Sequence, residues 1–145
     1  MSYTTKSLRS ALAIFTFAAL VATVSTDANA QDKPKGKPWA APESAVKMKN
    51  PVKSDAASIA EGKELYAQHC KSCHGAKGKG DGTKAEKIDI SCGDFASDEA
   101  VKATDGELYW KTTEGRKPMP SYKEKLSDNE RWAIINYIRT FGKGK

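Results

Sequence analysis

Apolar residues recur at helical spacing in three stretches of the chain, and each stretch begins at a serine or threonine typical of a helix start. The first begins at Ser58, where Ser58 and Glu61 have the spacing of a capping box. The apolar side of this helix contains Ile59, Gly62, Leu65 and Tyr66. A glycine inside a helix costs about 1 kcal/mol relative to alanine. Gly62 therefore predicts that another helix passes close to this point.

The two later stretches carry the same signals. Thr104 and Glu107 form a capping box ahead of the apolar Leu108-Tyr109-Trp110, and Gly115 is placed to end that helix. The last helix begins at Ser127, which has Glu130 three positions on, and it ends at Gly142. Its inner face contains Ile134, Tyr137, Ile138 and Phe141.

The remaining segments give no sign of a sheet. Ser97 is a further helix start, and the four glycines within residues 75–84 mark a flexible loop. No stretch alternates apolar and polar residues with hairpin turns between them. We therefore predict an all-α fold.

The first thirty residues have the features of a secretory signal peptide. Lys6 and Arg9 precede a fourteen-residue apolar run from Ala11 to Val24, and the small-residue sequence Ala28-Asn29-Ala30 follows. The run is shorter than the roughly 20 residues that span a bilayer. We expect cleavage after Ala30, a periplasmic location, and no membrane span in the mature chain.

Residues 31–57 differ in composition from the rest of the mature chain. They contain four of the six prolines, several lysines and Trp39. This composition is typical of an extended arm and not of a domain. We expect residues 31–37 to be mobile, and the arm from Trp39 onward to lie against a domain formed by residues 58–145.

The charge of the mature chain limits its partners. Removing residues 1–30 takes away Lys6, Arg9 and Asp27, which leaves 22 basic and 17 acidic residues and a net charge of +5. The lysines form no long run, and this part has only three arginines. Nucleic-acid binding favours clustered Arg and Lys, so we expect no nucleic-acid partner. An acidic protein surface, or simple solubility, explains the charge better.

Three cysteines carry the chemistry of the chain. Cys70, Cys73 and Cys92 are too few, and odd in number, for a complete disulfide framework. Cys70-Lys71-Ser72-Cys73-His74 is a C-x-x-C-H sequence, the pattern of c-type haem attachment. Two thiols on one helical turn can each add to a haem vinyl group, and the following histidine can then ligate the iron. A tethered haem would also supplement a core that has few large apolar residues.

Two other interpretations of this motif fit less well. A thioredoxin-like redox pair expects a βαβ pattern, which the sequence lacks. A structural zinc site needs four ligands, and His69, Cys70, Cys73 and His74 lie too close together in sequence to surround one ion. We interpret His69 as a surface or helix-end histidine.

A second axial ligand would come from a methionine. Met119 lies between Pro118 and Pro120, forty-five residues after His74, on a stretch that the prolines keep extended. Met48 lies in the arm between two lysines, without such support. We favour Met119, since His and Met together are a known ligand set for haem iron.

The Cys70–Gly75 motif, Pro118-Met119-Pro120 and the closing Trp132…Tyr137-Ile138-Arg139 helix, in this order, resemble the class I monohaem cytochromes c, in particular the small periplasmic bacterial carriers. The resemblance covers about residues 58–142. It implies a cytochrome c fold of about 3–5 helices around one covalently attached haem c. It also implies that the first and last helices cross, with Gly62 and Tyr66 against Tyr137. Cys92 and the arm depart from the family pattern.

Other residues near the expected site remain open. Tyr109 and Trp110 are candidates for the haem-pocket walls, and Arg116 either neutralises a haem propionate or is a solvated loop residue. Cys92 is either a buried or half-buried small residue or an exposed thiol that couples two copies of the chain.

We expect a monomeric one-electron carrier and not an enzyme, because a haem with both His and Met ligands has no vacant position for a substrate. The alternatives are an electron-transfer subunit of a larger periplasmic dehydrogenase or reductase, a haem enzyme, or a sensor in which a small molecule displaces Met119. A basic rim for acidic redox partners, or else ordinary solvated lysines, would be formed by Lys71, Lys77, Lys79, Lys117 and Lys123.

Overall fold

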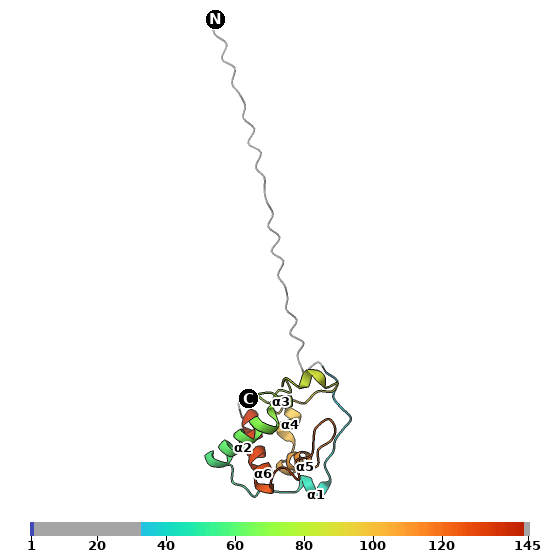
Figure 1. Cartoon of the computed structure of the whole chain (residues 1–145), viewed down its shortest axis with the longest axis vertical. Helices are drawn as coiled ribbons and strands as arrows, with labels where there is room; N and C mark the ends of the chain where they lie inside the picture. The colour runs from blue at the N-terminus through green and yellow to red at the C-terminus, as the bar shows by residue number, and fades with distance from the viewer. Residues whose placement is uncertain (2–32, 144–145) are drawn as a thin grey trace.

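The computed structural model describes Met1 and residues 33–143, and this part of the chain is helical with no β-strand. The elements in chain order are α1 (Glu43–Val46), α2 (Ala56–His69), α3 (Lys71–His74), the 3-10 helix η2 (Ala85–Lys87), α4 (Asp98–Lys102), α5 (Asp105–Glu114) and α6 (Asp128–Phe141) (Figure 1). The all-α prediction is confirmed. Six α-helices in the described part slightly exceed the predicted three to five, because α1 and α3 have only four residues each. The predicted signal peptide lies outside the described residues.

The predicted helix starts are right for two of the three main helices. The Thr104 side chain accepts a hydrogen bond from the Glu107 backbone at the start of α5, and Ser127 forms a complete capping box with Glu130 at the start of α6. The prediction that α2 begins at Ser58 is wrong, because Asp55 is the N-cap and Ser58 is its partner in the box. Aspartate is as good an N-cap as serine, and the true box lies three residues earlier.

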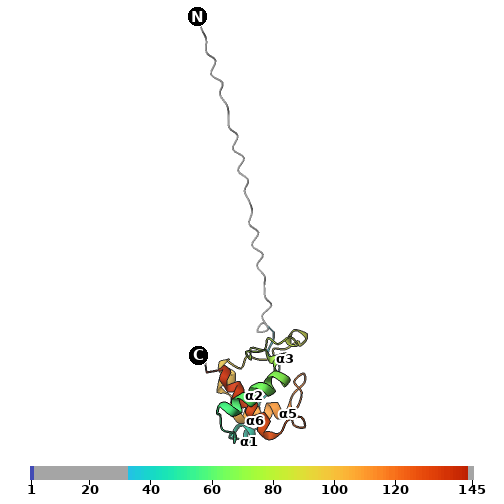
Figure 2. The ribbon, with the colours of Figure 1, turned by 60° about the vertical axis from the view of Figure 1, so that its left-hand side comes forward.

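Helices α2 and α6 cross at Gly62, as predicted (Figures 1 and 2). A Cβ atom at position 62 would lie 2.0 Å from the Ala133 carbonyl oxygen and 3.0 Å from the Cβ of Tyr137. The Tyr66 ring lies 5.3 Å from the Tyr137 ring in an edge-to-face arrangement, one turn further along α2. The absence of a side chain at Gly62 therefore allows the two helices to make backbone contact.

Helix α6 is buried on more sides than its apolar stripe predicts, because two polar side chains face the core. The Asn136 side chain donates to the Ser58 hydroxyl at 3.1 Å and to the carbonyls of Val52 and Lys53 at 3.2 and 3.3 Å. Its Oδ1 accepts from Asn50 Nδ2 at 2.8 Å. Asn136 thereby fixes the segment before α2 against the last helix.

Arg131 is the second buried polar residue of α6, with 4% of its surface exposed. Its Nη1 donates to three backbone carbonyls in the turn at residues 122–126, at 2.8 to 3.3 Å. Its Nη2 donates to the Tyr109 hydroxyl and to Asp128. Arg131 therefore fixes the turn that leads into α6, and these bonds compensate for burying its charge.

The arm contacts the domain from its first described residue. Lys33 Nζ donates to the carbonyls of Ala85 and Ile88 at 2.7 and 2.6 Å, and the Pro34 carbonyl accepts from the Ser91 backbone at 3.0 Å. We predicted a mobile segment over residues 31–37. Residues 31 and 32 lie outside the described part of the chain, and the mobility of residues 33–37 stays a prediction. The Lys33 ammonium finds backbone acceptors in η2 and directly after it, which the sequence pattern does not reveal.

Candidate functional site

The C-x-x-C-H motif forms one helical turn between the end of α2 and Gly75. Cys70 ends α2, and its carbonyl accepts from the backbones of Cys73 and His74 at 3.1 and 2.9 Å. Gly75 follows at φ 79°, a conformation that ends α3 directly after the histidine. The buried Tyr66 hydroxyl donates to the Gly75 carbonyl at 2.8 Å. Both thiols and the imidazole therefore project from a fixed turn.

Both thiols are free and partly buried. Burial, with a smaller contribution from the neighbouring Cys73, raises the pKa of Cys70 to about 12. Burial likewise raises the pKa of Tyr122 to about 12, with contributions from both cysteines. The Cys70 thiol is therefore protonated at neutral pH and lies close to Cys73 without a cross-link. This arrangement suits addition of both sulfurs to one cofactor.

His74 is held as a neutral imidazole. Burial lowers its pKa to about 4, and the backbone of Cys92 opposes this shift only in part. The ring stacks on Phe95 with 4.7 Å between centroids, and its buried Nδ1 has no hydrogen-bond partner. A neutral imidazole is the form that ligates metal ions, and an unpartnered buried nitrogen is unusual in proteins. The residues of this turn fit a covalently attached haem.

Met119 lies at the end of a tight turn after α5. The backbones of Arg116 and Met119 exchange two hydrogen bonds, of 3.0 and 2.9 Å, across the cis Lys117–Pro118 bond. Met119 is partly buried and packs against the same core cluster as Cys70. Met48, the other candidate ligand, is 40% exposed and lies beside Gly106 at the start of α5.

Tyr122 connects the Met119 turn to the attachment turn. Its hydroxyl donates to the His69 carbonyl at 2.6 Å, and its backbone donates to the Thr112 carbonyl at 3.2 Å. Tyr122 is three residues after Met119, and His69 directly precedes Cys70. Tyr122 has no predicted role in the sequence pattern, although a tyrosine close to a proline-flanked methionine is a usable signal. The His69 ring lies edge-on to the Tyr122 ring at 5.9 Å, at the end of α2.

The three predicted pocket residues have other neighbours in this structure. Tyr109 stacks on Trp132 with 3.9 Å between ring centroids. Trp110 lies 6.1 Å from Trp39 of the arm. Arg116 also faces Trp39. Their assignment to a haem pocket stays a prediction.

Cys92 is partly buried, and its pKa is raised by burial and by the nearby Cys73, while Lys33 lowers it. The structure therefore places the third cysteine on the attachment-turn side of the domain.

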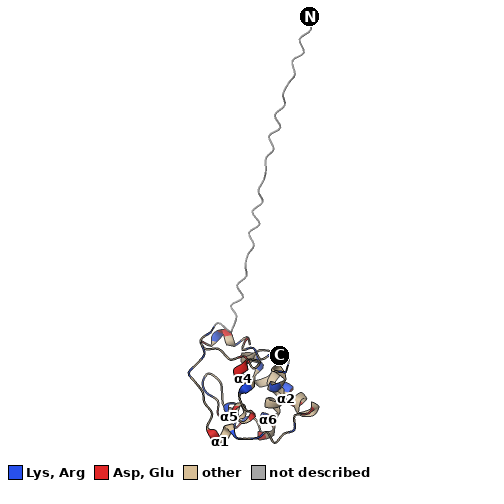
Figure 3. Ribbon diagram, turned by 180° about the vertical axis from the view of Figure 1, so that it is seen from behind, with Lys and Arg blue, Asp and Glu red and all other residues tan. Residues whose placement is uncertain are grey.

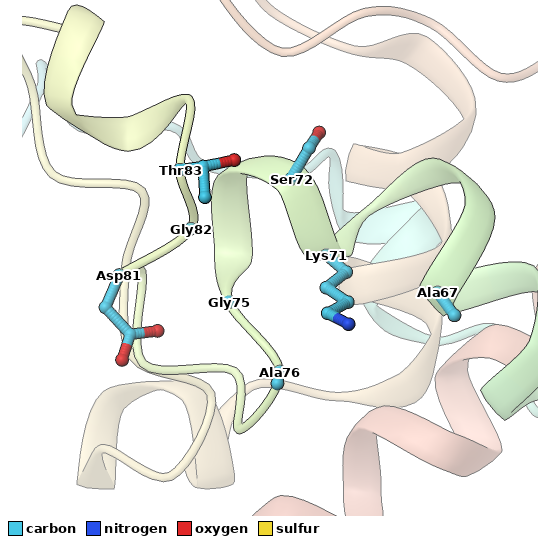
Figure 4. Close-up of a pocket in the computed structure, with 8 residues that line it drawn as sticks. All are labelled: Ala67, Lys71, Ser72, Gly75, Ala76, Asp81, Gly82 and Thr83. Atoms are coloured by element: carbon cyan, nitrogen blue, oxygen red, sulfur yellow. The ribbon is translucent and has the colours of Figure 1, made fainter.

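A hollow of about 340 Å³ lies on the outer side of the attachment turn, between α3 and the glycine-rich loop (Figure 4). Lys71 and Asp81 lie on opposite sides of it, and both are exposed. The residues that line this hollow include neither of the two motif cysteines, nor His74, nor Met119.

Basic and acidic residues are both spread along the chain. Lys and Arg positions and Asp and Glu positions both occur on helices and loops of the ribbon (Figure 3). The five lysines of the predicted basic rim are all exposed. Within the described part of the chain, no helix has the length and apolarity needed to cross a bilayer.

An all-helical domain with a C-x-x-C-H turn at the end of its first long helix, crossed by its last, defines a c-type cytochrome. Comparison with protein families agrees. The family described as "Cytochrome C oxidase, cbb3-type, subunit III" matches residues 57–138, and the chain belongs to this family. The protein is thus a c-type cytochrome with covalently bound haem c, and its class function is electron transfer.

Solved structures support the same class. A chain of the Kuenenia stuttgartiensis reducing HAO-like protein complex Kustc0457/Kustc0458 is 27% identical, with a TM-score of 0.58; the match covers 78% of this chain and 54% of that chain. This chain therefore spans about half the length of that relative. The KustC0563 c-type cytochrome is 34% identical, with a TM-score of 0.50, and the match covers 55% of this chain and 95% of that chain. A search of curated proteins found no match.

Proposed function

We propose that the protein is a periplasmic, monomeric one-electron carrier with a single haem c attached to Cys70 and Cys73. In this proposal His74 and Met119 are the side chains that would hold the iron. The observation that carries it is the hydrogen bond from Tyr122 to the His69 carbonyl, which joins the turn bearing Met119 to the turn bearing His74. Met48 has no comparable connection.

Each of these four side chains would have one role in holding the haem. Each thiol would add across one vinyl group, so that sulfur bonds to one carbon, the proton goes to the other, and nothing is released. The neutral His74 imidazole would hold the iron through a nitrogen lone pair, and the Met119 thioether would favour the reduced iron and so raise the potential. When bound, haem supplies an iron that alternates between ferrous and ferric states. With both ligands in place no substrate can reach the metal, which favours a carrier over an enzyme.

A second candidate is an electron-transfer subunit of a larger redox complex. The observation that favours it is the similarity to a chain solved within a two-protein complex. For both candidates, the exposed lysines would face an acidic surface of the partner protein. The two candidates share the site and differ only in whether docking is permanent.

The variant Met119→Ala tests the ligand assignment, with Met48→Ala as its matched control. Met119→Ala should keep the covalent haem but lose the weak long-wavelength absorption band of methionine-ligated ferric haem. It should also bind cyanide or carbon monoxide, and its reduction potential should fall because the thioether no longer favours ferrous iron. Met48→Ala should resemble the wild type. Rapid ligand binding by the wild type, or these changes in Met48→Ala instead, would contradict the proposal.

A further inference from the structure

The arm contacts the turn that carries Met119. The guanidinium carbon of Arg116 lies 4.7 Å from the centroid of the Trp39 ring, within cation–π distance. Arg116 Nη1 also donates to the Pro38 carbonyl at 3.1 Å. The Trp39 ring lies 6.1 Å from the Trp110 ring, which belongs to α5. A single indole from the arm therefore lies against both α5 and the turn that follows it.

Arg116 is also one end of the Met119 turn. Its backbone N–H donates to the Met119 carbonyl at 3.0 Å, and its carbonyl accepts from the Met119 backbone at 2.9 Å. The other side of the turn is held from within the domain, where the Ser121 hydroxyl donates to the Thr113 carbonyl at 2.6 Å. The arm thus supplies the support on the Arg116 side, and the domain supplies the support on the far side.

We propose that Trp39 and Arg116 are positioning residues that keep Met119 in place as an iron ligand. The inference rests on the proposed ligation by Met119 and deepens it, because it makes the arm part of the distal side of the site. Without the ring beside it, the Arg116 side chain loses its cation–π contact and is left with its exposed hydrogen bond to the Pro38 carbonyl. The Met119 turn then opens more often, and the thioether leaves the iron more often.

The arm offers a matched control for this inference. Lys35 pairs with Glu99 at 2.7 Å, and both side chains are about 80% exposed. This pair ties the same arm to α4 and does not touch the Met119 turn. Lys35→Ala therefore weakens an arm contact of another kind and leaves the Trp39–Arg116 contact in place.

The test uses the ferric holoprotein of the wild type and of Trp39→Ala, Trp39→Phe and Lys35→Ala, with the rate of cyanide binding, the methionine absorption band and the reduction potential as readouts. Trp39→Ala should bind cyanide about tenfold faster, the factor expected from losing a contact worth about 1.4 kcal/mol. Its absorption band should weaken and its potential should fall. Trp39→Phe should stay near the wild type, because phenylalanine also presents a ring to the guanidinium. Lys35→Ala should match the wild type.

Two results would overturn the inference. One is a wild-type cyanide rate in Trp39→Ala; the other is an equal acceleration in Lys35→Ala, which would indicate general loosening of the arm. If Met119→Ala behaves as proposed while Trp39→Ala equals the wild type, only the positioning role is wrong. If the wild type lacks the methionine band and Met119→Ala changes nothing, the ligand assignment itself fails.

Discussion

Replacing Gly62 with alanine should destabilise the protein, although alanine is the better helix former. The new Cβ would lie 2.0 Å from the Ala133 carbonyl oxygen and 2.6 Å from its carbon, both rigid backbone atoms. Ordinary van der Waals contact begins at about 3.4 Å, so α2 and α6 must separate by about 1.4 Å where they cross. Overpacking of this kind costs about 1–3 kcal/mol. Because the clash is with backbone, we expect the upper half of that range.

The higher helix propensity of alanine offsets about 1 kcal/mol of this cost, so the free energy of unfolding should fall by about 1–2 kcal/mol. For a domain of this size, each kcal/mol of lost stability lowers the melting temperature by roughly 4–8 °C. Thermal and guanidinium unfolding, followed by far-UV circular dichroism of the holoprotein, measure the change.

Ala60→Gly is the matched control, because position 60 is exposed on the same helix. Propensity alone should make this control about 1 kcal/mol less stable. A Gly62→Ala protein that is more stable than the wild type by about 1 kcal/mol would refute the close-contact explanation.

Three further predictions concern the site and its support. Cys70→Ala combined with Cys73→Ala should abolish covalent haem, and haem that survives acid–acetone extraction of this double variant would contradict the attachment sites. Arg131→Met should lower the free energy of unfolding by about 2–4 kcal/mol, because several buried carbonyls lose their donor; an unchanged denaturation midpoint would contradict this. The free energy of unfolding should fall as pH rises from 10 to 12, since the pKa of Tyr122 is raised to about 12 in the fold and the unfolded phenol ionises first. Tyr122→Phe should make that decline less steep, and an identical pH profile in both proteins would count against the shifted pKa.

The sequence predicted what depends on local patterns. The caps at Thr104 and Ser127 and the close approach of a helix to Gly62 follow from residue type and spacing, and the structure has all three. That the last helix is the one that crosses there was implied by the family resemblance. The attachment turn follows from one motif whose chemistry dictates its spacing. The start of α2 was wrong because Asp55 and Ser58 both suit an N-cap and spacing could not choose between them.

What the sequence could not predict are the polar side chains that bond to backbone outside their own helix. Asn136 and Arg131 interrupt the apolar pattern of α6. Asn136 bonds to carbonyls 83 and 84 residues away in sequence, and Arg131 bonds to carbonyls in the turn just before α6. Lys33 of the arm likewise bonds to carbonyls of η2 and of Ile88, which follows η2. Such contacts depend on which loops lie next to each other in the fold, and the sequence pattern does not specify this.

The attachment turn is fixed at both ends by buried phenols. Tyr122 bonds to the residue before Cys70, and Tyr66 bonds to the residue after His74. Both hydroxyls have pKa values raised by burial, so neither changes charge near neutral pH. If His74 ligates the haem iron as proposed, the turn that bears it should relax only slightly when the iron gains or loses an electron. A small reorganisation energy, and hence fast electron exchange over a given distance, is the consequence expected of these two tyrosines.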